Sequence, residues 1–423
     1  MSALQKKLLA ALALLLIFQA GYNLARYLHD LDAGDRFGGD FICFWDAAVR
    51  ARLGDYGAIY QPETWRLALS DHSPRTLAWF VYPPFSLFGL QLIGGMSYNQ
   101  AVAWWSLIPL PLYLILVIAH ARRADAKLRD LQVSQGQEWG WSGSAILASL
   151  TAPFLSANLF SGQIGTLVAV LFLAATYVLP RRPILAGVFV GLIAIKPQLG
   201  LLFPLALIAA GQWRAIAAAT VTIAALSVIS LLQFGPALWT DYLEMAALFG
   251  QFIAMEYGRI EDLALAPYVS LRSVGVPVLV AAVAQATISL GVLASIVTAF
   301  RRSQKGAASI DDGRLDLRLG LLAAGALLFT PYALSYETPL ISLAVIPLFV
   351  RAWRRGWDGW ELAAVVALVV TPYAQILAVG HRVPFAMAAL ILAFGVLGRR
   401  YVLDTPGRSA SACGGEPLRV RSA

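Results

Sequence analysis

Asp40 is the first side chain in this sequence that is placed to do chemistry. It follows a pair of glycines and opens a stretch, Phe41 to Leu53, in which apolar and polar residues alternate at helical spacing. A carboxylate at such a place can act as a general base, which takes a proton from a reacting hydroxyl. It can equally cap the helix by accepting hydrogen bonds from free N–H groups. Asp46 lies about 120° further round the helix, so we expect it to be a solvated or salt-bridged surface group.

Lys196 is the second candidate. It stands in the sequence Lys196-Pro197-Gln198, between two half-length apolar segments. Either the chain breaks here near an interface, or it buries the cation inside one long helix. A lysine at membrane depth costs free energy and is by default a candidate functional residue. Its ligand would be a lipid phosphate or pyrophosphate, with Gln198 as a neighbouring substrate contact. The alternative is that Lys196 only extends its ammonium group to the outer headgroups.

Two amides and a tyrosine form further candidates. Asn158 and Gln163 interrupt two apolar segments in the stretch 158–165, where they serve either as turn residues or as contacts for sugar hydroxyls. Tyr82 precedes the pair Pro83-Pro84, and proline suits the first turn of a helix. Its ring either anchors the chain at the headgroup region or lines a substrate groove.

The last candidates are Tyr336 and Glu337, at the end of an apolar segment that begins near residue 319. Glu337 is the acidic residue of that stretch. A structural hydrogen bond and a contact with substrate are equally good explanations of both side chains.

The elements that must position these residues are membrane helices. The chain has 423 residues, of which 59% are hydrophobic and 13% charged, whereas soluble domains carry about 25% charged residues. Apolar runs that approach the ~20 residues needed to cross a bilayer follow one another along the chain. The sequence therefore predicts an all-α polytopic membrane protein.

The distribution of basic residues predicts the topology. Lys and Arg occur in short bursts between apolar runs, such as Arg122-Arg123, Arg301-Arg302 and Arg354-Arg355, which is the pattern of cytoplasmic loops. Placing these bursts inside gives about twelve crossings, the first over residues 8–25. The others are predicted at 99–121, 143–158, 163–179, 183–195, 197–210, 214–233, 274–299, 319–335, 338–350, 359–379 and 384–398. The segment from Pro83 to Gly95 is too short to cross and is predicted to be re-entrant or interfacial.

Acidic residues gather in two predicted outside loops, residues 27–80 and 234–273. Residues 1–403 then form one transmembrane domain, with interfacial helices in the first loop. The polar tail, residues 404–423, is rich in Gly, Ser and Arg and is expected to be a disordered cytoplasmic segment.

Several classes of function are disfavoured. The net charge is +8, but the basic residues are dispersed, whereas a nucleic-acid site needs one contiguous basic surface. The two cysteines, Cys43 and Cys413, fall on opposite sides of the predicted membrane and give no disulfide framework. No cofactor is predicted. The carboxylates of the outside loops leave a divalent metal open, although they show no tight ligand spacing.

Several short stretches, taken in their order along the chain, resemble glycosyltransferase family 87, the polyprenyl-phosphate-mannose-dependent mannosyltransferase-like group. The resemblance spans roughly residues 38–340. The stretches that carry it are Asp40-Phe41 with Trp45 and Ala47-Ala48, Gly54-Asp55 with Tyr60, Tyr82-Pro83-Pro84, Ser161-Gly162-Gln163, Ala186-Gly187 with Gly191, Lys196-Pro197-Gln198, and Trp213-Arg214. It implies the C-type glycosyltransferase bundle, with Asp40 as the catalytic base.

The sequence departs from the family pattern in three places. Ser161 stands where the family commonly has asparagine, and Glu337 where it often has aspartate. No histidine stands beside Tyr336, so a histidine contact with the donor phosphate does not transfer to this chain.

The resemblance implies a hexosyltransferase of the bacterial inner membrane whose active site faces the periplasm. It would move a hexose, expected to be mannose, from a polyprenyl-phosphate donor to a lipid-linked or cell-envelope glycan acceptor. Asp40 would be the base, Lys196 would hold the departing phosphate, and the Gln163 region would hold the sugar. No glycine-rich nucleotide loop is present, which disfavours a nucleotide-sugar donor.

Three alternative functions remain at this point, and one of them, a non-enzymatic assembly partner, would tolerate the loss of Asp40. A transporter or flippase would place polar residues in paired broken helices of two repeated halves, and the chain shows one such break, at Lys196, without a convincing repeat. A glycan ligase would use the same chemistry on a lipid-pyrophosphate donor.

Overall fold

The computed structural model describes residues 38–61, 79–130, 139–255, 264–301, 313–377 and 383–404, together with Leu14, Phe18, Gly21 and Ala25. The expectations for most of the first crossing, for residues 27–37 and 62–78 of the first loop, for residues 256–263 of the second and for the tail beyond Asp404 lie outside these residues.

All regular secondary structure in the described residues is helical, apart from one isolated antiparallel bridge between Ala264 and Leu334. Its helices run in the order α2 Phe41–Leu53, η1 Tyr56–Ala58, η2 Pro84–Ser86, α4 Leu87–Leu90, α5 Tyr98–Leu107, α6 Pro109–Asp130, α7 Trp141–Thr151, α8 Pro153–Ser161, α9 Gly165–Val178, α10 Pro183–Leu192, η3 Ile193–Ile195, α11 Pro197–Gly200, α12 Leu202–Ala209, α13 Trp213–Phe234, α14 Pro236–Met255, α15 Pro267–Ser273, α16 Val278–Arg301, α17 Leu315–Phe329, η6 Ser335–Glu337, α18 Thr338–Arg355, α19 Gly359–Leu377 and α20 Phe385–Leu403.

Four helical stretches in the described ranges are long and apolar enough to cross a membrane. They are the joined α5–α6 stretch Tyr98–Asp130, α13, α16 and α20, and the α7–α8 pair, bent by 44°, makes a fifth if it is counted as one span. Other apolar helices are shorter, as α9 is with 14 residues, or about 21 Å at 1.5 Å per residue. The fold is thus that of an all-helical membrane protein, and the number of twelve crossings stays a prediction.

The short segment after Pro83 is not one long helix. It forms η2, which begins at Pro84, and the four-residue α4, and then turns into α5. Proline occupies the first turn of η2, as expected. Pro84, Phe85 and Leu87 are buried, so this segment packs against protein rather than lying free at a surface.

The outward helices and the central helices differ in what they expose. On α13, 80% of Leu232 is exposed, and on α16, 74% of Leu279 is exposed. By contrast α17 and α18 pack against each other, and nearly all of their residues are buried. Exposed apolar rows around a buried helical centre are what a lipid environment stabilises, since a soluble protein rarely leaves such patches uncovered.

Two of the arginines from the basic bursts, Arg354 and Arg400, form buried ion pairs. Arg354 of α18 donates to Asp125 at the end of α6, with Nη2 2.7 Å from Oδ2. Arg400 of α20 donates to Glu361 of α19, with Nε 2.7 Å from Oε1. The opposite end of α18 begins at Thr338, directly after Glu337. Eighteen residues of helix, about 27 Å, therefore separate the end that carries Arg354 from the end next to Glu337.

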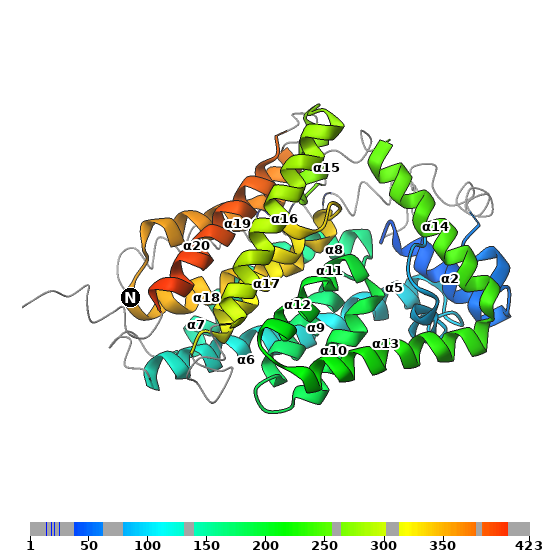
Figure 1. Cartoon of the computed structure of the whole chain (residues 1–423), viewed down its shortest axis with the longest axis horizontal. Helices are drawn as coiled ribbons and strands as arrows, with labels where there is room; N and C mark the ends of the chain where they lie inside the picture. The colour runs from blue at the N-terminus through cyan, green and yellow to red at the C-terminus, as the bar shows by residue number, and fades with distance from the viewer. Residues whose placement is uncertain are drawn as a thin grey trace, which may run out of the picture.

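In Figure 1, α2 (blue) and α14 (green) lie on the right side of the molecule, while α19 and α20 (orange to red) lie toward the left. Helix α2 contacts α4 and α5, and α14 contacts η1 and η2. In the described part of the first predicted loop, α2 and η1 are therefore helices that pack against other helices of the chain.

Candidate functional site

Asp40 stands immediately before α2 but does not cap it. Its backbone occupies the N-cap position in a helical conformation, and its side chain makes no capping hydrogen bond. Instead Oδ2 accepts a hydrogen bond from Gln163 Nε2 at 2.9 Å. Phe41 and Phe44 of α2 are buried and pack against Trp105. The carboxylate is thus directed toward another part of the chain by a helix that is fixed at its apolar face.

Gln163 lies in the tight connection between α8 and α9. The preceding Gly162 has φ +65°, and a Cβ atom on it would lie 2.4 Å from Phe41 Cβ. Only glycine allows the connection to come this close to the start of α2. Both ends of the Gln163 side-chain amide make hydrogen bonds. Nε2 donates to Asp40, and Oε1 accepts a hydrogen bond of 2.6 Å from the Tyr82 hydroxyl. Asp40, Gln163 and Tyr82 therefore form one hydrogen-bonded chain.

Lys196 stands at the break between η3 and α11, which is one of the two arrangements that the sequence left open. Its side chain is only 3% exposed and forms an ion pair with Glu337, which is 1% exposed. Nζ also lies 4.6 Å from the centre of the Tyr336 ring and 5.8 Å from that of Tyr82, within the range of cation–π attraction. An ammonium group held inward in this way does not extend to the headgroups, so the snorkelling alternative is wrong.

Asn158 holds the segment that carries Glu337. Its Nδ2 donates to the Tyr336 carbonyl at 3.1 Å, and its Oδ1 accepts from Thr166 Oγ1 at 2.8 Å. A Cβ atom on Gly165 would lie 2.0 Å from the same Tyr336 carbonyl oxygen, so α9 begins in direct contact with η6. The Tyr336 hydroxyl lies 2.7 Å from that of Tyr332.

The electrostatics of Asp40 combine three effects. Burial raises the pKa of this carboxyl above its usual value, and the hydrogen bond from Gln163 and the positive charge of Lys196 oppose the rise. Burial disfavours the charged form, whereas a donor and a cation favour it. Asp40 is thus a carboxylate with increased basicity, which suits a general base.

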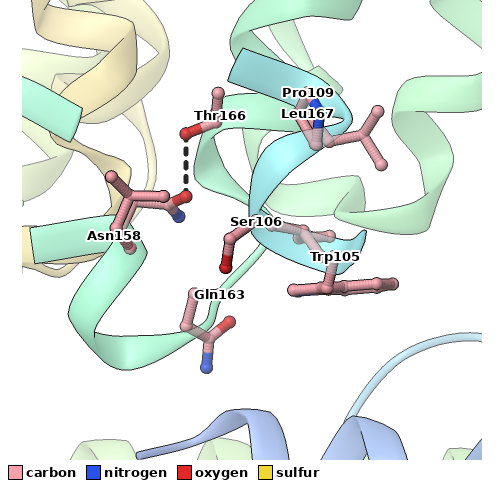
Figure 2. Close-up of a pocket in the computed structure, with 9 residues that line it drawn as sticks. Trp105, Ser106, Pro109, Asn158, Gln163, Thr166 and Leu167 are labelled. Carbon is pink, nitrogen blue, oxygen red and sulfur yellow. Dashed lines mark hydrogen bonds between the residues drawn. The ribbon is translucent and has the colours of Figure 1, made fainter. Parts of the chain in front are cut away.

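A pocket adjoins Gln163. It is lined by Trp105, Ser106, Pro109, Asn158, Leu159, Gln163, Ile164, Thr166 and Leu167. Figure 2 shows the side chains of Ser106 and Gln163 next to each other, and the hydrogen bond between Asn158 and Thr166 to one side of them. The Ser106 hydroxyl is buried without a hydrogen-bond partner among the described residues.

Sequence reasoning missed Trp105, Ser106 and Thr166. Trp105 Nε1 donates to the Gly162 carbonyl at 2.9 Å, so this side chain supports the connection that carries Gln163. The polar Ser106 and the nearby Pro109 interrupt an apolar run. This interruption could have indicated the break between α5 and α6 and the residues beside it.

Other sequence expectations have simple outcomes. Asp46 forms a salt bridge of 2.6 Å with Arg50, as predicted for a surface group. Gln198 is half-buried on α11, and its amide makes no hydrogen bond to the described site residues. Among the described residues, no group of three or more His, Cys, Asp or Glu side chains is arranged to hold a metal ion.

Comparison with protein families decides the class of the chain. Residues 80–331 match the model of glycosyltransferase family 87, which is more than half of the sequence. The chain belongs to glycosyltransferase family 87. The matched range includes Tyr82, Gln163 and Lys196, while Asp40 and Glu337 fall outside it. No curated protein and no solved structure matches the chain. This family 87 chain is thus a membrane glycosyltransferase.

Proposed function

We propose that this protein transfers a hexose, expected to be mannose, from a polyprenyl-phosphate-sugar donor to a lipid-linked or cell-envelope glycan acceptor. The observation that carries the proposal is that the candidate base, Asp40, is linked through two side chains to the candidate cation, Lys196. Asp40 bonds to Gln163, Gln163 bonds to Tyr82, and the Tyr82 ring faces the Lys196 ammonium. Both groups that glycosyl transfer from a phosphate needs thus lie along one connected row of side chains.

The roles follow from the chemistry of the bond. Asp40 takes the proton of the acceptor hydroxyl as the oxygen attacks C1 of the sugar. Lys196 stabilises the negative charge on the departing phosphate. The pocket beside Gln163, with Ser106 and Trp105, offers hydroxyl and ring contacts for a sugar. A single displacement with one base inverts the anomeric centre, so the product and donor linkages should have opposite configurations.

The proposed orientation places the site on the periplasmic face of the bacterial inner membrane. Helix α18 begins directly after Glu337 at the site and ends at the basic burst Arg354-Arg355, and clustered arginines favour the cytoplasmic side. Leu53, which is 77% exposed at the end of α2, provides a probe. In a protein with Cys43 and Cys413 changed to alanine, Leu53→Cys should react with an impermeant thiol reagent on intact spheroplasts. If Leu53→Cys reacts only after the spheroplasts are lysed, the site faces the cytoplasm and the proposed orientation is wrong.

The direct test of function uses purified protein in lipid nanodiscs with a membrane-lipid extract as acceptor. A polyprenyl-phosphate-hexose donor should give a glycosylated lipid and free polyprenyl phosphate, and nucleotide sugars should give neither. Transfer from nucleotide sugars alone would refute the proposed donor. Release of the whole lipid-linked saccharide across the bilayer without cleavage would support the transporter alternative, which family membership disfavours.

A further inference from the structure

Lys196 and Glu337 form a buried ion pair beside the rings of Tyr82 and Tyr336. Both side chains are almost fully buried, and the Tyr82 and Tyr336 rings cover the ammonium group. Nζ makes the ion pair but no regular hydrogen bond among the described residues, and Glu337 Oε2 has no hydrogen-bond partner there. An ammonium group has three donors, so N–H groups of Lys196 remain for the oxygens of a ligand.

The reaction changes the charge of the phosphate. In the donor the phosphate is a diester, bonded to both the lipid and the sugar, with one negative charge. Transfer forms the bond from the acceptor oxygen to C1, and the hydroxyl proton goes to Asp40. The bond from C1 to the phosphate oxygen breaks, and its electron pair stays on that oxygen. The product is a phosphate monoester with two negative charges, since the second pKa of such a group is about 6.

We propose that Glu337 is a specificity-determining residue that makes the Lys196 site accept a singly charged phosphodiester and disfavour a doubly charged phosphate. This inference rests on the proposed function, because it assumes that the donor phosphate binds Lys196. One cation paired with one carboxylate is already neutral. A diester adds one negative charge to that pair, whereas a monoester or a diphosphate adds two beside the carboxylate of Glu337.

The buried setting makes this difference large. Charges interact more strongly where protein excludes water, and like charges placed side by side oppose binding. Glu337 therefore destabilises the bound product relative to the bound donor and assists its release. The same carboxylate disfavours a lipid-diphosphate donor, which separates monosaccharide transfer from the glycan-ligase alternative.

The test compares two probes that differ by one methyl group and one negative charge, farnesyl phosphate and its methyl diester. Their dissociation constants are measured at pH 8 in nanodiscs for the wild type, Glu337→Gln and Glu337→Asp. A matched control is Glu244→Gln, which removes an exposed carboxylate on α14. Glu337→Gln should tighten binding of the monoester by about tenfold or more and change binding of the diester much less. Glu337→Asp and Glu244→Gln should keep the wild-type ratio of the two constants.

Equal changes for the two probes, or weaker binding of the monoester, would overturn the proposal. The wild type alone provides a second measurement should Glu337→Gln fail to fold. It should bind the diester at least as tightly as the monoester, and a clear preference for the monoester would refute the role of Glu337. The variant Lys196→Gln distinguishes a failure of the Glu337 proposal from a failure of the proposed function. If it leaves both constants unchanged, the phosphate does not bind at Lys196 at all.

Discussion

Gln163 Nε2 lies 2.9 Å from Asp40 Oδ2, and this hydrogen bond joins the start of α2 to the connection between α8 and α9. The bond gives the carboxylate a fixed direction. It also explains why Asp40 does not cap its own helix, although it occupies the position from which a cap is made.

Asp40→Asn separates the catalytic role from a structural one. Loss of a general base typically costs ~10²–10⁴-fold in rate, so transfer should fall by at least that factor while donor binding persists. Asparagine caps a helix as well as aspartate, so a capping role would leave activity nearly intact. The matched control is Asp46→Asn, six residues along α2, which should keep wild-type transfer. Retention of more than about a tenth of the activity by well-folded Asp40→Asn would remove Asp40 from the mechanism.

The ionisation of Asp40 should affect the pH dependence of both transfer and folding stability. Because burial raises its pKa and a base must be ionised, kcat/KM should fall as the pH drops through that raised value. The contribution of Asp40 to folding stability is fully present below the pKa of the unfolded chain and is lost as the pH rises through the folded pKa. Asp40→Asn should therefore be at least as heat-stable as the wild type at neutral pH. A lower Tm for this variant would contradict the electrostatic argument.

Gln163→Leu tests whether this amide positions the base. The hydrogen bond from Nε2 favours the ionised carboxylate, so its loss should raise the pKa of Asp40 further and move the acidic limb of the kcat/KM profile to higher pH. At high pH the rate should recover to within about tenfold of the wild type, which corresponds to a contact of about 1.4 kcal/mol. The control is Gln251→Leu, at an exposed position of α14. A uniform loss of rate at every pH would indicate only a structural role.

Lys196→Gln should affect activity and stability together. Loss of a charged contact of about 1.5–3 kcal/mol corresponds to a decrease of about 10–100-fold in kcat/KM for the donor. Breaking the buried pair leaves Glu337 uncompensated, which costs about 3–5 kcal/mol of stability and lowers Tm. The double variant Lys196→Gln/Glu337→Gln should recover Tm but not transfer. Recovery of both would show that Lys196 matters only as the partner of Glu337.

Gly165→Ala tests the contact between α9 and η6. The added Cβ would lie 2.0 Å from the Tyr336 carbonyl oxygen, so the segment that carries Glu337 must shift. We expect lower Tm and a loss of transfer greater than tenfold, since misplaced groups contribute little to catalysis. Gly250→Ala is the control, because a Cβ there meets nothing within 4 Å, and alanine in a helix is about 0.5–1 kcal/mol more favourable than glycine. Equal Tm and equal transfer in the two variants would show that the close contact between α9 and η6 at Gly165 is not required.

Much of the local structure could be read directly from the sequence. The helical spacing after Asp40 predicts a helix from Phe41 to Leu53, and α2 has these bounds. The helical start at Pro84 also appears where it was expected, and the break at Lys196 is one of the two arrangements that the sequence left open. These features depend on glycine, proline and apolar periodicity, which act over a few residues. Composition likewise determines the membrane character, because an apolar chain of this kind cannot be stabilised by water.

The tertiary structure decided how the candidate residues are combined. The sequence left Asp40 either as a cap or as a base, and only its contact with Gln163, across the α8–α9 connection, shows which group it meets. Nothing in the order of residues indicates that Glu337 pairs with Lys196, or that the Gln163 amide is shared between Asp40 and Tyr82. These pairs join segments far apart in the chain. They form only when helix packing brings those segments together, and no local period or propensity encodes that packing.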